Sequence, residues 1–414
     1  MKLVLFLHEL ALGGTSINAI ELATKLHDAL GYEVLIFAPP GPMLPVVERS
    51  GLRYVAAPEA RMHPCLRRIR ALRALVRTEH PDLVYVWETW ALLDAFYGVH
   101  LPMRVPILLT DMQMFAARIL PRSVPTTFGT IQLVETARKA GIRDVRLLVP
   151  PVDLEANRPG THDALSVRIA MEVEPNEILL VIVSRLVHTM KAESLHLAID
   201  AVERLGRNSP IRLLIVGDGP ARRELEARAA SVNGALNRKA ILLPGAWLDP
   251  RPAYAAADIV IGMGSSALRG MAYEKPVIVV GEGGFASTLT RESMDYFHYH
   301  GLFGKGRGAI DAGCLRDAIA ELADSLDLRQ SLGAFSLEYV QQYYSLEVVS
   351  KKLGQICEDV VKTKLSMRAT LGDSIRTGAI YLRERRFLWR ASRAAPTQLL
   401  FPDAAVSSQS AGGV

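Results

Sequence analysis

The sequence has little cysteine, no long apolar run and no carboxylate cluster of the kind that holds Mg²⁺. Its three cysteines, Cys65, Cys314 and Cys357, are odd in number and far apart, with no CxxC or histidine-pair spacing. This pattern excludes a zinc site and predicts reduced thiols in a cytoplasmic protein. No stretch approaches the roughly 18 apolar residues of a membrane span. The apolar start meets His8 and Glu9 too soon for a signal peptide.

The chain also lacks the broad positive surface that is typical of nucleic-acid binding. The formal net charge is +5, but nine Lys or Arg against Asp373 and Glu384 fall between Lys362 and Arg393, a local excess of seven. The rest of the chain is therefore close to neutral. This distribution argues against a nucleic-acid partner.

Length and hydrophobic pattern predict an α/β protein of two Rossmann-like, doubly wound domains. With 414 residues, half of them hydrophobic, the chain is about twice the common domain size. Short β-rich runs alternate with longer segments of helical period, which predicts parallel sheets covered by helices on both faces. The expected strands are Leu3–Leu7, Glu33–Ala38, Leu83–Trp87, Ile107–Thr110, Val145–Val149, Leu179–Ser184, Arg212–Val216, Ala240–Leu243, Ile259–Ile261 and Val277–Val280.

Composition also predicts where the domains divide. From residue 150 to residue 163 the pattern lapses into Pro, Gly and polar residues, which suits a linker. We expect one domain over residues 1–165, a second over residues 166–362, and a basic helix followed by a disordered tail over residues 363–414. Ligands of doubly wound sheets bind at the carboxyl ends of the strands, so the residues after each strand are the candidate site residues.

Two such positions suggest an anion site. Gly13 and Gly14 precede a helix, and paired glycines let the backbone approach a phosphate while the helix supplies N–H groups. A tight strand-to-helix turn would give the same pattern. Arg185 and Lys191 follow a strand and stand before another helix, where two cations can bind a diphosphate and the charge that appears when it leaves. The alternative is a pair of solvated basic residues.

A series of motifs then appears in order, without large insertions. It comprises the glycine loop, His80-Pro81-Asp82, Val152-Asp153, Arg185 with Lys191, Val216-Gly217-Asp218-Gly219-Pro220 and Tyr254-Ala255-Ala256-Ala257-Asp258. Over about residues 1–360 this series resembles the retaining glycosyltransferases of family 4, which have the GT-B fold. The resemblance implies two Rossmann-like domains facing across a cleft, with an N-terminal acceptor-binding domain and a C-terminal nucleotide-sugar-binding domain.

The resemblance also implies roles for individual residues. Arg185 and Lys191 would grip the donor diphosphate, and Gly13 and Gly14 would close over it from the other domain. The base would lie near Ala246 and Trp247, and Gly217 belongs to the donor side of the series. Ser265, Ser266 and Ala267, which open a helix after Ile261, can offer amides to phosphate. Such enzymes need neither metal nor cofactor, since the donor itself is the nucleotide diphosphate sugar.

The chain departs from the family pattern at two places. The paired glutamates of the family would fall at Gly262 and Arg269, and the second of them normally accepts hydrogen bonds from the donor ribose. Arg269 can only donate, so the contact to the ribose must differ here. Met112 stands where the family has a histidine near the sugar, and a thioether cannot do acid–base work. His8, Glu88 and Asp111 are nearby substitutes on the acceptor side.

Two basic segments remain. Residues 66–77 read as a sheet-covering helix with a solvated arginine face. Residues 375–393 are compatible with a helix packed on the protein body and equally with a peripheral membrane contact.

The sequence thus predicts a retaining, metal-independent hexosyltransferase that uses a UDP- or GDP-sugar. Its acceptor is not identified; a small molecule of natural-product biosynthesis, a thiol or amine, and a growing polysaccharide all stay open, as does the oligomeric state. One alternative is an inactive GT-B protein that binds only nucleotide. A remote alternative is a nucleotide-sugar epimerase, which shares the GT-B fold.

Overall fold

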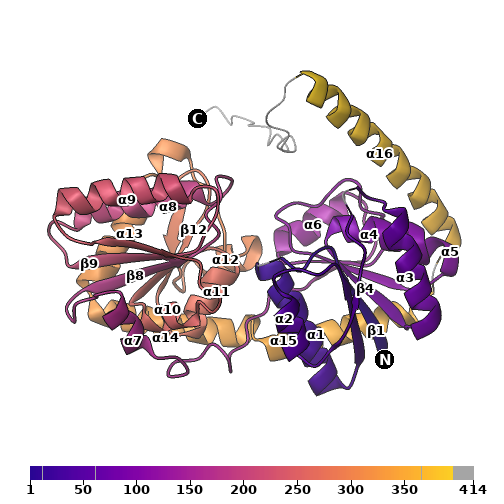
Figure 1. The fold of residues 1–414 in the computed structure, drawn as a ribbon, viewed down its shortest axis with the longest axis horizontal. Coiled ribbons are helices and arrows are strands. Elements are labelled where there is room, and N and C mark those ends of the chain that lie inside the picture. The colour runs from indigo at the N-terminus through magenta and orange to yellow at the C-terminus, as the bar shows by residue number, and fades with distance from the viewer. Residues whose placement is uncertain (12, 61, 365, 395–414) are drawn as a thin grey trace, which may run out of the picture.

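The molecule has two α/β lobes, each built around one sheet (Figure 1). The computed structural model describes residues 1–394 except residues 12, 61 and 365, and it describes no side chains for residues 385–394. The end of the chain, where the disordered tail is predicted, lies outside the described residues. Two doubly wound units, as the sequence predicts, make up the described chain.

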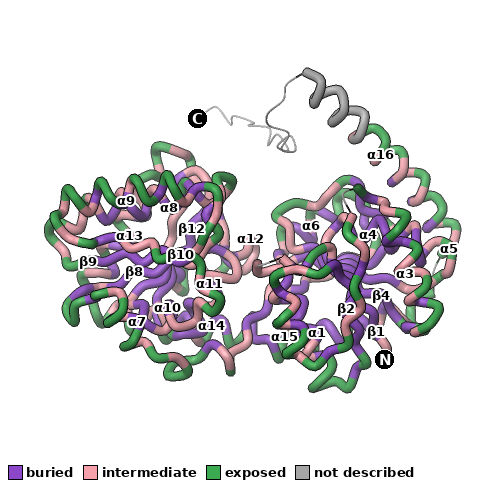
Figure 2. The backbone as a smooth tube through the Cα atoms, in the orientation of Figure 1, coloured by how far each residue is buried: buried purple, intermediate pink, exposed green. Residues whose placement is uncertain are grey.

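The first lobe has seven parallel strands in the order β3-β2-β1-β4-β5-β6-β7. β1 and β4 lie in its middle and are buried on both faces, as Figure 2 shows. The strands are β1 (Lys2–Leu7), β2 (Glu33–Ala38), β3 (Arg53–Ala56), β4 (Leu83–Trp87), β5 (Ile107–Asp111), β6 (Thr126–Phe128) and β7 (Val145–Leu147). The helices are α1 (Gly14–Leu30), α2 (Leu44–Arg49), α3 (Leu66–Glu79), α4 (Thr89–Ala95), a π-helical turn (Phe96–His100), α5 (Leu101–Met103) and α6 (Ile131–Lys139).

The second lobe has six strands in the order β10-β9-β8-β11-β12-β13. They are β8 (Ile178–Val183), β9 (Ile211–Val216), β10 (Ile241–Gly245), β11 (Ile259–Gly262), β12 (Val277–Val280) and β13 (Ala286–Thr288). Its helices are α7 (Ala164–Ala170), α8 (Ala192–Leu205), α9 (Arg222–Leu236), α10 (Arg251–Ala256), α11 (Ser265–Ala272), α12 (Met294–His300), a 3-10 turn (Gly308–Ile310), α13 (Cys314–Asp324) and α14 (Leu326–Tyr343). The sheets are parallel as expected, except that the additional short strand β13 runs antiparallel to β12 at one edge. A three-residue strand that returns directly needs no crossover helix.

The ten expected strands are confirmed, with ends that shift by at most two residues. β3, β6 and β13 are additional, and each has only three or four residues. Runs this short carry too few side chains to display a period.

The chain crosses between the lobes twice, and the two crossings are hydrogen-bonded to each other. The Val152 N–H donates to the Tyr344 carbonyl at 2.8 Å, and the Leu346 N–H donates to the Val152 carbonyl at 2.8 Å. After the second crossing, α15 (Leu346–Lys362) packs against α1 of the first lobe. Its buried residues, including Leu353 and Cys357, belong to the same core as β1. The division of the chain into domains at residues 165 and 362 stays a prediction. Helix α15, which lies within residues 166–362, packs with the first lobe.

Helix α16 (Met367–Ala394) begins on the first lobe and then leads away from it (Figure 1). Its first turns pack on the body, where Thr370 and Thr377 are buried. Among the described residues, no helix is long and apolar enough to cross a membrane.

The packing of α15 leads to a test of stability. Leu353 is fully buried among side chains of the first lobe, so Leu353→Ala should lower the free energy of unfolding by about 2–5 kcal/mol. Urea unfolding followed by tryptophan fluorescence would measure it, because Trp87 is buried in the same core. Lys351→Ala, on the exposed side of α15, is the matched control and should cost under about 0.5 kcal/mol. Equal effects of the two changes would contradict the assignment of α15 to this core.

Candidate functional site

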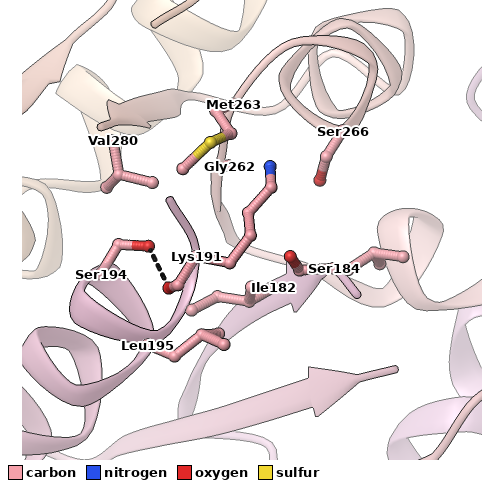
Figure 3. A pocket seen from close by; sticks show the side chains of 10 residues that line it. Ile182, Ser184, Lys191, Ser194, Leu195, Gly262, Met263, Ser266 and Val280 are labelled. Carbon is pink, nitrogen blue, oxygen red and sulfur yellow. Dashed lines mark hydrogen bonds between the residues drawn. The ribbon is translucent and has the colours of Figure 1, made fainter. Parts of the chain in front are cut away.

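Arg185 and Lys191 lie together at the carboxyl edge of the second sheet. Arg185 follows β8 and is exposed, and Lys191 is the residue immediately before α8. Lys191 lines a small pocket together with Ser184, Gly262 and Ser266. Figure 3 shows its amino group between Met263 and Ser266, pointing across the pocket toward α11. The loop between β8 and α8 thus directs Lys191 into the pocket and leaves Arg185 exposed to solvent.

These two cations have no acidic partner. Among the described residues, no carboxylate lies within 4.0 Å of either side chain. Burial, and next the neighbouring Arg185, lower the pKa of Lys191 to about 8. A desolvated ammonium beside a second cation is destabilised unless an anion joins it. The arrangement is therefore suited to an anionic ligand.

The loop that contains Gly217 packs tightly against the same edge. A Cβ at Gly217 would lie 1.8 Å from the Ser184 carbonyl oxygen, so only glycine fits there. The Ser184 N–H donates to the Val216 carbonyl at 3.0 Å. Gly217 therefore fixes the loop after β8, which carries Arg185. A direct contact of Gly217 with ligand stays a prediction.

The glycine loop of the first lobe meets the start of α11 across the cleft. Gly13 precedes α1, which begins at Gly14. A Cβ at Gly14 would lie 2.9 Å from the Ser265 Oγ, so the backbones of the two lobes approach closely. Ser265, Ser266 and Ala267 form the first turn of α11, where the backbone N–H groups of a helix have no partner within the helix. The structure thus brings together the residues of both lobes that are predicted to bind phosphate.

Arg269 pairs with a carboxylate of the opposite lobe. Its guanidinium lies 3.9 Å from the carboxylate of Glu21 on α1. Both residues lie further along their helices than Gly14 and Ser265, which form the other contact between α1 and α11. Burial raises the pKa of Glu21 to about 7, although Arg269 opposes this. The Glu21 Oε2 is buried and has no hydrogen-bond partner. Sequence reasoning missed Glu21, because only the meeting of α1 with α11 reveals it.

Ala246 and Trp247 follow β10, as the base-binding prediction requires. Ala246 is exposed, while Trp247 is partly buried and packs against the core of the second lobe. Part of the indole ring therefore packs against this core. Its role toward a base stays a prediction.

The four acceptor-side candidates occupy strand ends of the first sheet. Burial, with help from His63 and Arg68, lowers the pKa of His8 to about 4, so His8 is neutral at pH 7. Asp111 is buried and accepts hydrogen bonds from Thr89 Oγ1 at 2.9 Å and the Gln113 N–H at 3.0 Å. Those bonds fix the local backbone.

Met112 packs against the core of the first lobe, and its sulfur would lie 3.2 Å from a Cβ added at Gly129. It contributes packing at the edge of the cleft.

Glu88 differs from the other candidates. Its φ of 72° is positive, a left-handed conformation that non-glycine residues rarely adopt. Burial, followed by Glu9 and Asp111, raises the pKa of Glu88 to about 7, and Arg185 of the opposite lobe acts in the other direction. Glu88 can therefore exchange a proton at neutral pH, within electrostatic range of the diphosphate candidates.

A second titratable cluster escaped the sequence analysis. His63 Nδ1 lies 2.8 Å from a carboxylate oxygen of the fully buried Asp94, and the His63 ring is 5.0 Å from that of His8. Arg68, expected on the solvated face of its helix, is 1% exposed and donates to the Pro58 and His8 carbonyls. That expectation was wrong because these carbonyls satisfy the guanidinium in the interior. Leu66, at the start of the same helix, is 69% exposed.

Comparison with known proteins agrees with this arrangement. Residues 177–322 match the family model described as glycosyl transferases group 1. No protein with a curated description matches the sequence significantly. A glycosyltransferase from Rickettsia africae ESF-5 is similar in structure, with a TM-score of 0.72 and 14% identity over 88% of this chain and 99% of that one. HepE of Anabaena, solved with UDP, has a TM-score of 0.67 and 16% identity over 87% and 100% of the two chains. The chain thus has the GT-B fold, and residues 177–322 of its second lobe are similar to group 1 glycosyl transferases.

The pKa of Lys191 predicts a gain in stability when its charge is removed. Because its folded-state pKa is about 8 against 10.5 in the unfolded chain, the unfolded chain binds the proton more tightly. The cost of charging Lys191 is fully present below pH 8 and disappears as the pH rises toward 10.5. Lys191→Met should therefore raise the free energy of unfolding by about 1–3 kcal/mol at pH 7, and by less at pH 10.

Urea unfolding at the two pH values measures this effect. Lys139→Met, at an exposed position on α6, is the control and should change stability by under about 0.5 kcal/mol. A Lys191→Met protein that is less stable than wild type at pH 7 would contradict the prediction.

Proposed function

We propose that this protein is a retaining, metal-independent glycosyltransferase of family 4 that takes its sugar from a nucleotide diphosphate sugar. One observation carries the proposal: in the described part of the chain, Arg185 and Lys191 have no carboxylate within 4.0 Å, and Lys191 lines a pocket that the first turn of α11 borders. An ammonium with a lowered pKa beside a guanidinium gains most from a doubly charged anion. A diphosphate in this place would also meet the glycine loop before α1.

The comparisons support the proposal. The matched region, residues 177–322, includes Arg185, Lys191 and Arg269. HepE of Anabaena has been solved with UDP and with UDP-glucose, and it shares the fold at 14–16% identity. On these grounds we propose that this chain also uses a nucleotide-sugar donor, with UDP or GDP as the nucleotide.

The proposed step breaks the bond between the anomeric carbon and the diphosphate oxygen. The electron pair of that bond goes to the diphosphate, whose added charge Arg185 and Lys191 stabilise more than they stabilise the intact donor. An acceptor atom forms the new bond to the anomeric carbon on the same face, which retains the configuration. The two side-chain cations supply the charge that a divalent metal supplies in other transferases.

Glu88 is the residue of the first lobe best suited to take the acceptor's proton. Its pKa of about 7 makes it ionised in half of the molecules at neutral pH. Asp111 and Met112 are occupied by local bonds and packing. Burial lowers the pKa of His8 to about 4, so its ring is a weak proton acceptor at pH 7. We propose that the acceptor enters from this lobe.

The donor ribose then faces the pair formed by Glu21 and Arg269. An arginine at this position cannot accept a hydrogen bond from a ribose hydroxyl, whereas the unpartnered Glu21 Oε2 can. We propose that α1 supplies the accepting carboxylate and Arg269 orients it.

The decisive test is turnover without the two cations. Arg185→Ala and Lys191→Ala should each lower kcat by about a hundredfold or more, as when one preorganised donor to a developing anion is removed. The measurement is release of nucleotide from UDP- and GDP-sugars at saturating donor, with nucleotide affinity determined in parallel. Arg207→Ala, an exposed arginine beyond α8, is the control and should leave kcat unchanged.

The outcomes separate the alternatives. Nucleotide binding without any sugar transfer or hydrolysis would favour the inactive GT-B protein. Turnover that survives both substitutions would place the diphosphate elsewhere.

A pH profile tests Glu88. In wild type kcat/KM should rise with pH through about 7, because the proton acceptor must be ionised. Glu88→Gln should remove this limb and lower the plateau by about 10²-fold or more. Glu9→Gln is the control: it takes away a negative charge that raises the pKa of Glu88, so the limb should move to lower pH with the plateau kept. A limb near pH 7 that persists in Glu88→Gln would assign the titration to another group.

A further inference from the structure

Helix α16 is held on the first lobe by specific polar contacts. The Ser123 N–H donates to the Asp373 carboxylate at 2.5 Å, and the Tyr97 hydroxyl donates to the Ser374 carbonyl at 2.8 Å. Arg376 donates to the carbonyls of Arg118 and Leu120. Thr377 is completely buried. One face of the helix is thereby fixed, and its orientation on the lobe is set.

The opposite face of α16 presents large apolar side chains to solvent. Leu371, Ile375 and Leu382 are 56%, 69% and 61% exposed. Their spacing of four and seven residues puts all three on one stripe of the helix. A soluble surface has no need for such a stripe, and clustered exposed apolar side chains indicate a contact surface.

An apolar groove runs beside this stripe, between α16 and the body. Its volume is about 500 Å³. Leu93 and Tyr97 form the wall on the body, while Ile375 and Leu382 form the wall on the helix. Pro64 lines one end of it, and the exposed Leu66 stands two residues further along the chain. The apolar surface thus extends from α16 to the start of α3.

Exposed cations occur on both helices that contribute to this apolar surface. Arg67 and Arg70 on α3 are exposed, as are Arg368 and Arg383 on α16. The carboxylate of Asp373 is buried and engaged with Ser123 and Arg376, so it does not offset them at the surface. An apolar stripe between arginines is complementary to a lipid surface that has negatively charged headgroups over a hydrocarbon interior.

We infer that this face, made of the outer side of α16, the adjoining groove and the start of α3, docks on an anionic lipid bilayer. The apolar side chains enter the hydrocarbon boundary, the arginines meet lipid phosphates, and the groove accepts part of an acyl chain. A second copy of the chain is a poorer occupant, because a symmetric contact would bring like-charged arginines together. The inference does not depend on the proposed catalytic activity.

Co-sedimentation of the full chain with vesicles tests this inference. Wild type should pellet with vesicles of phosphatidylglycerol and phosphatidylcholine, and much less with phosphatidylcholine alone or at high salt, because charge attraction is screened. Leu371→Glu/Ile375→Glu should reduce partitioning by about tenfold or more, since two carboxylates would enter the lipid boundary.

The control places the same change on the other lobe. Leu165 and Ile169 on α7 are 66% and 68% exposed at the same four-residue spacing, so Leu165→Glu/Ile169→Glu matches the test variant in chemistry and exposure. This control should pellet like wild type. Circular dichroism and nucleotide affinity would verify that both variants fold.

Three results would overturn the inference. The first is wild type that stays in solution with anionic vesicles. The second is equal pelleting of the two double variants. The third is a wild-type dimer in sedimentation velocity that Leu371→Glu/Ile375→Glu converts to a monomer without vesicle binding, which would assign the face to a second copy.

Discussion

The paired crossings between the lobes are the constraint on which the site depends. Val152 accepts from and donates to the segment that returns to the first lobe, so the chain leaves and re-enters that lobe at one place. Each sheet has its carboxyl edge toward the cleft, and the glycine loop reaches Ser265 of the other lobe. These hydrogen bonds join the two crossings, so the backbone connects the lobes at a single place. The residues of the two halves of the site face each other from lobes that are linked there.

The charges of the cleft are divided between the lobes. The second lobe contributes two cations, Arg185 and Lys191, for which the described residues provide no salt-bridge partner. The first lobe contributes carboxylates whose pKa values burial raises to about 7, Glu21 and Glu88. Carboxylates that are partly protonated at neutral pH repel an incoming diphosphate less than ionised ones would. The cleft can thus bring acidic groups near an anion at modest electrostatic cost.

Sequence periodicity predicted the fold well and the site in part. Buried parallel strands such as β4 are continuous apolar runs, so their positions follow from composition alone. Arg185 and Lys191 could be singled out because they stand in the loop between a strand and the following helix. Glu21 lies in the middle of α1 and His63 in an irregular loop, and neither position carries a periodic signal. Their neighbours come from the other lobe or from another element, which only tertiary packing reveals.

The place of α15 in the first core has a consequence for how the chain matures on the ribosome. Domains emerge amino-terminal end first, and each folds once its own core residues are available. The core around β1 needs Leu353 and Cys357, which are synthesised after the whole second sheet. The nascent first lobe must therefore wait with the α15-facing side of α1 uncovered, while the second lobe already has its strands. The order of completion is thus the reverse of the order of translation.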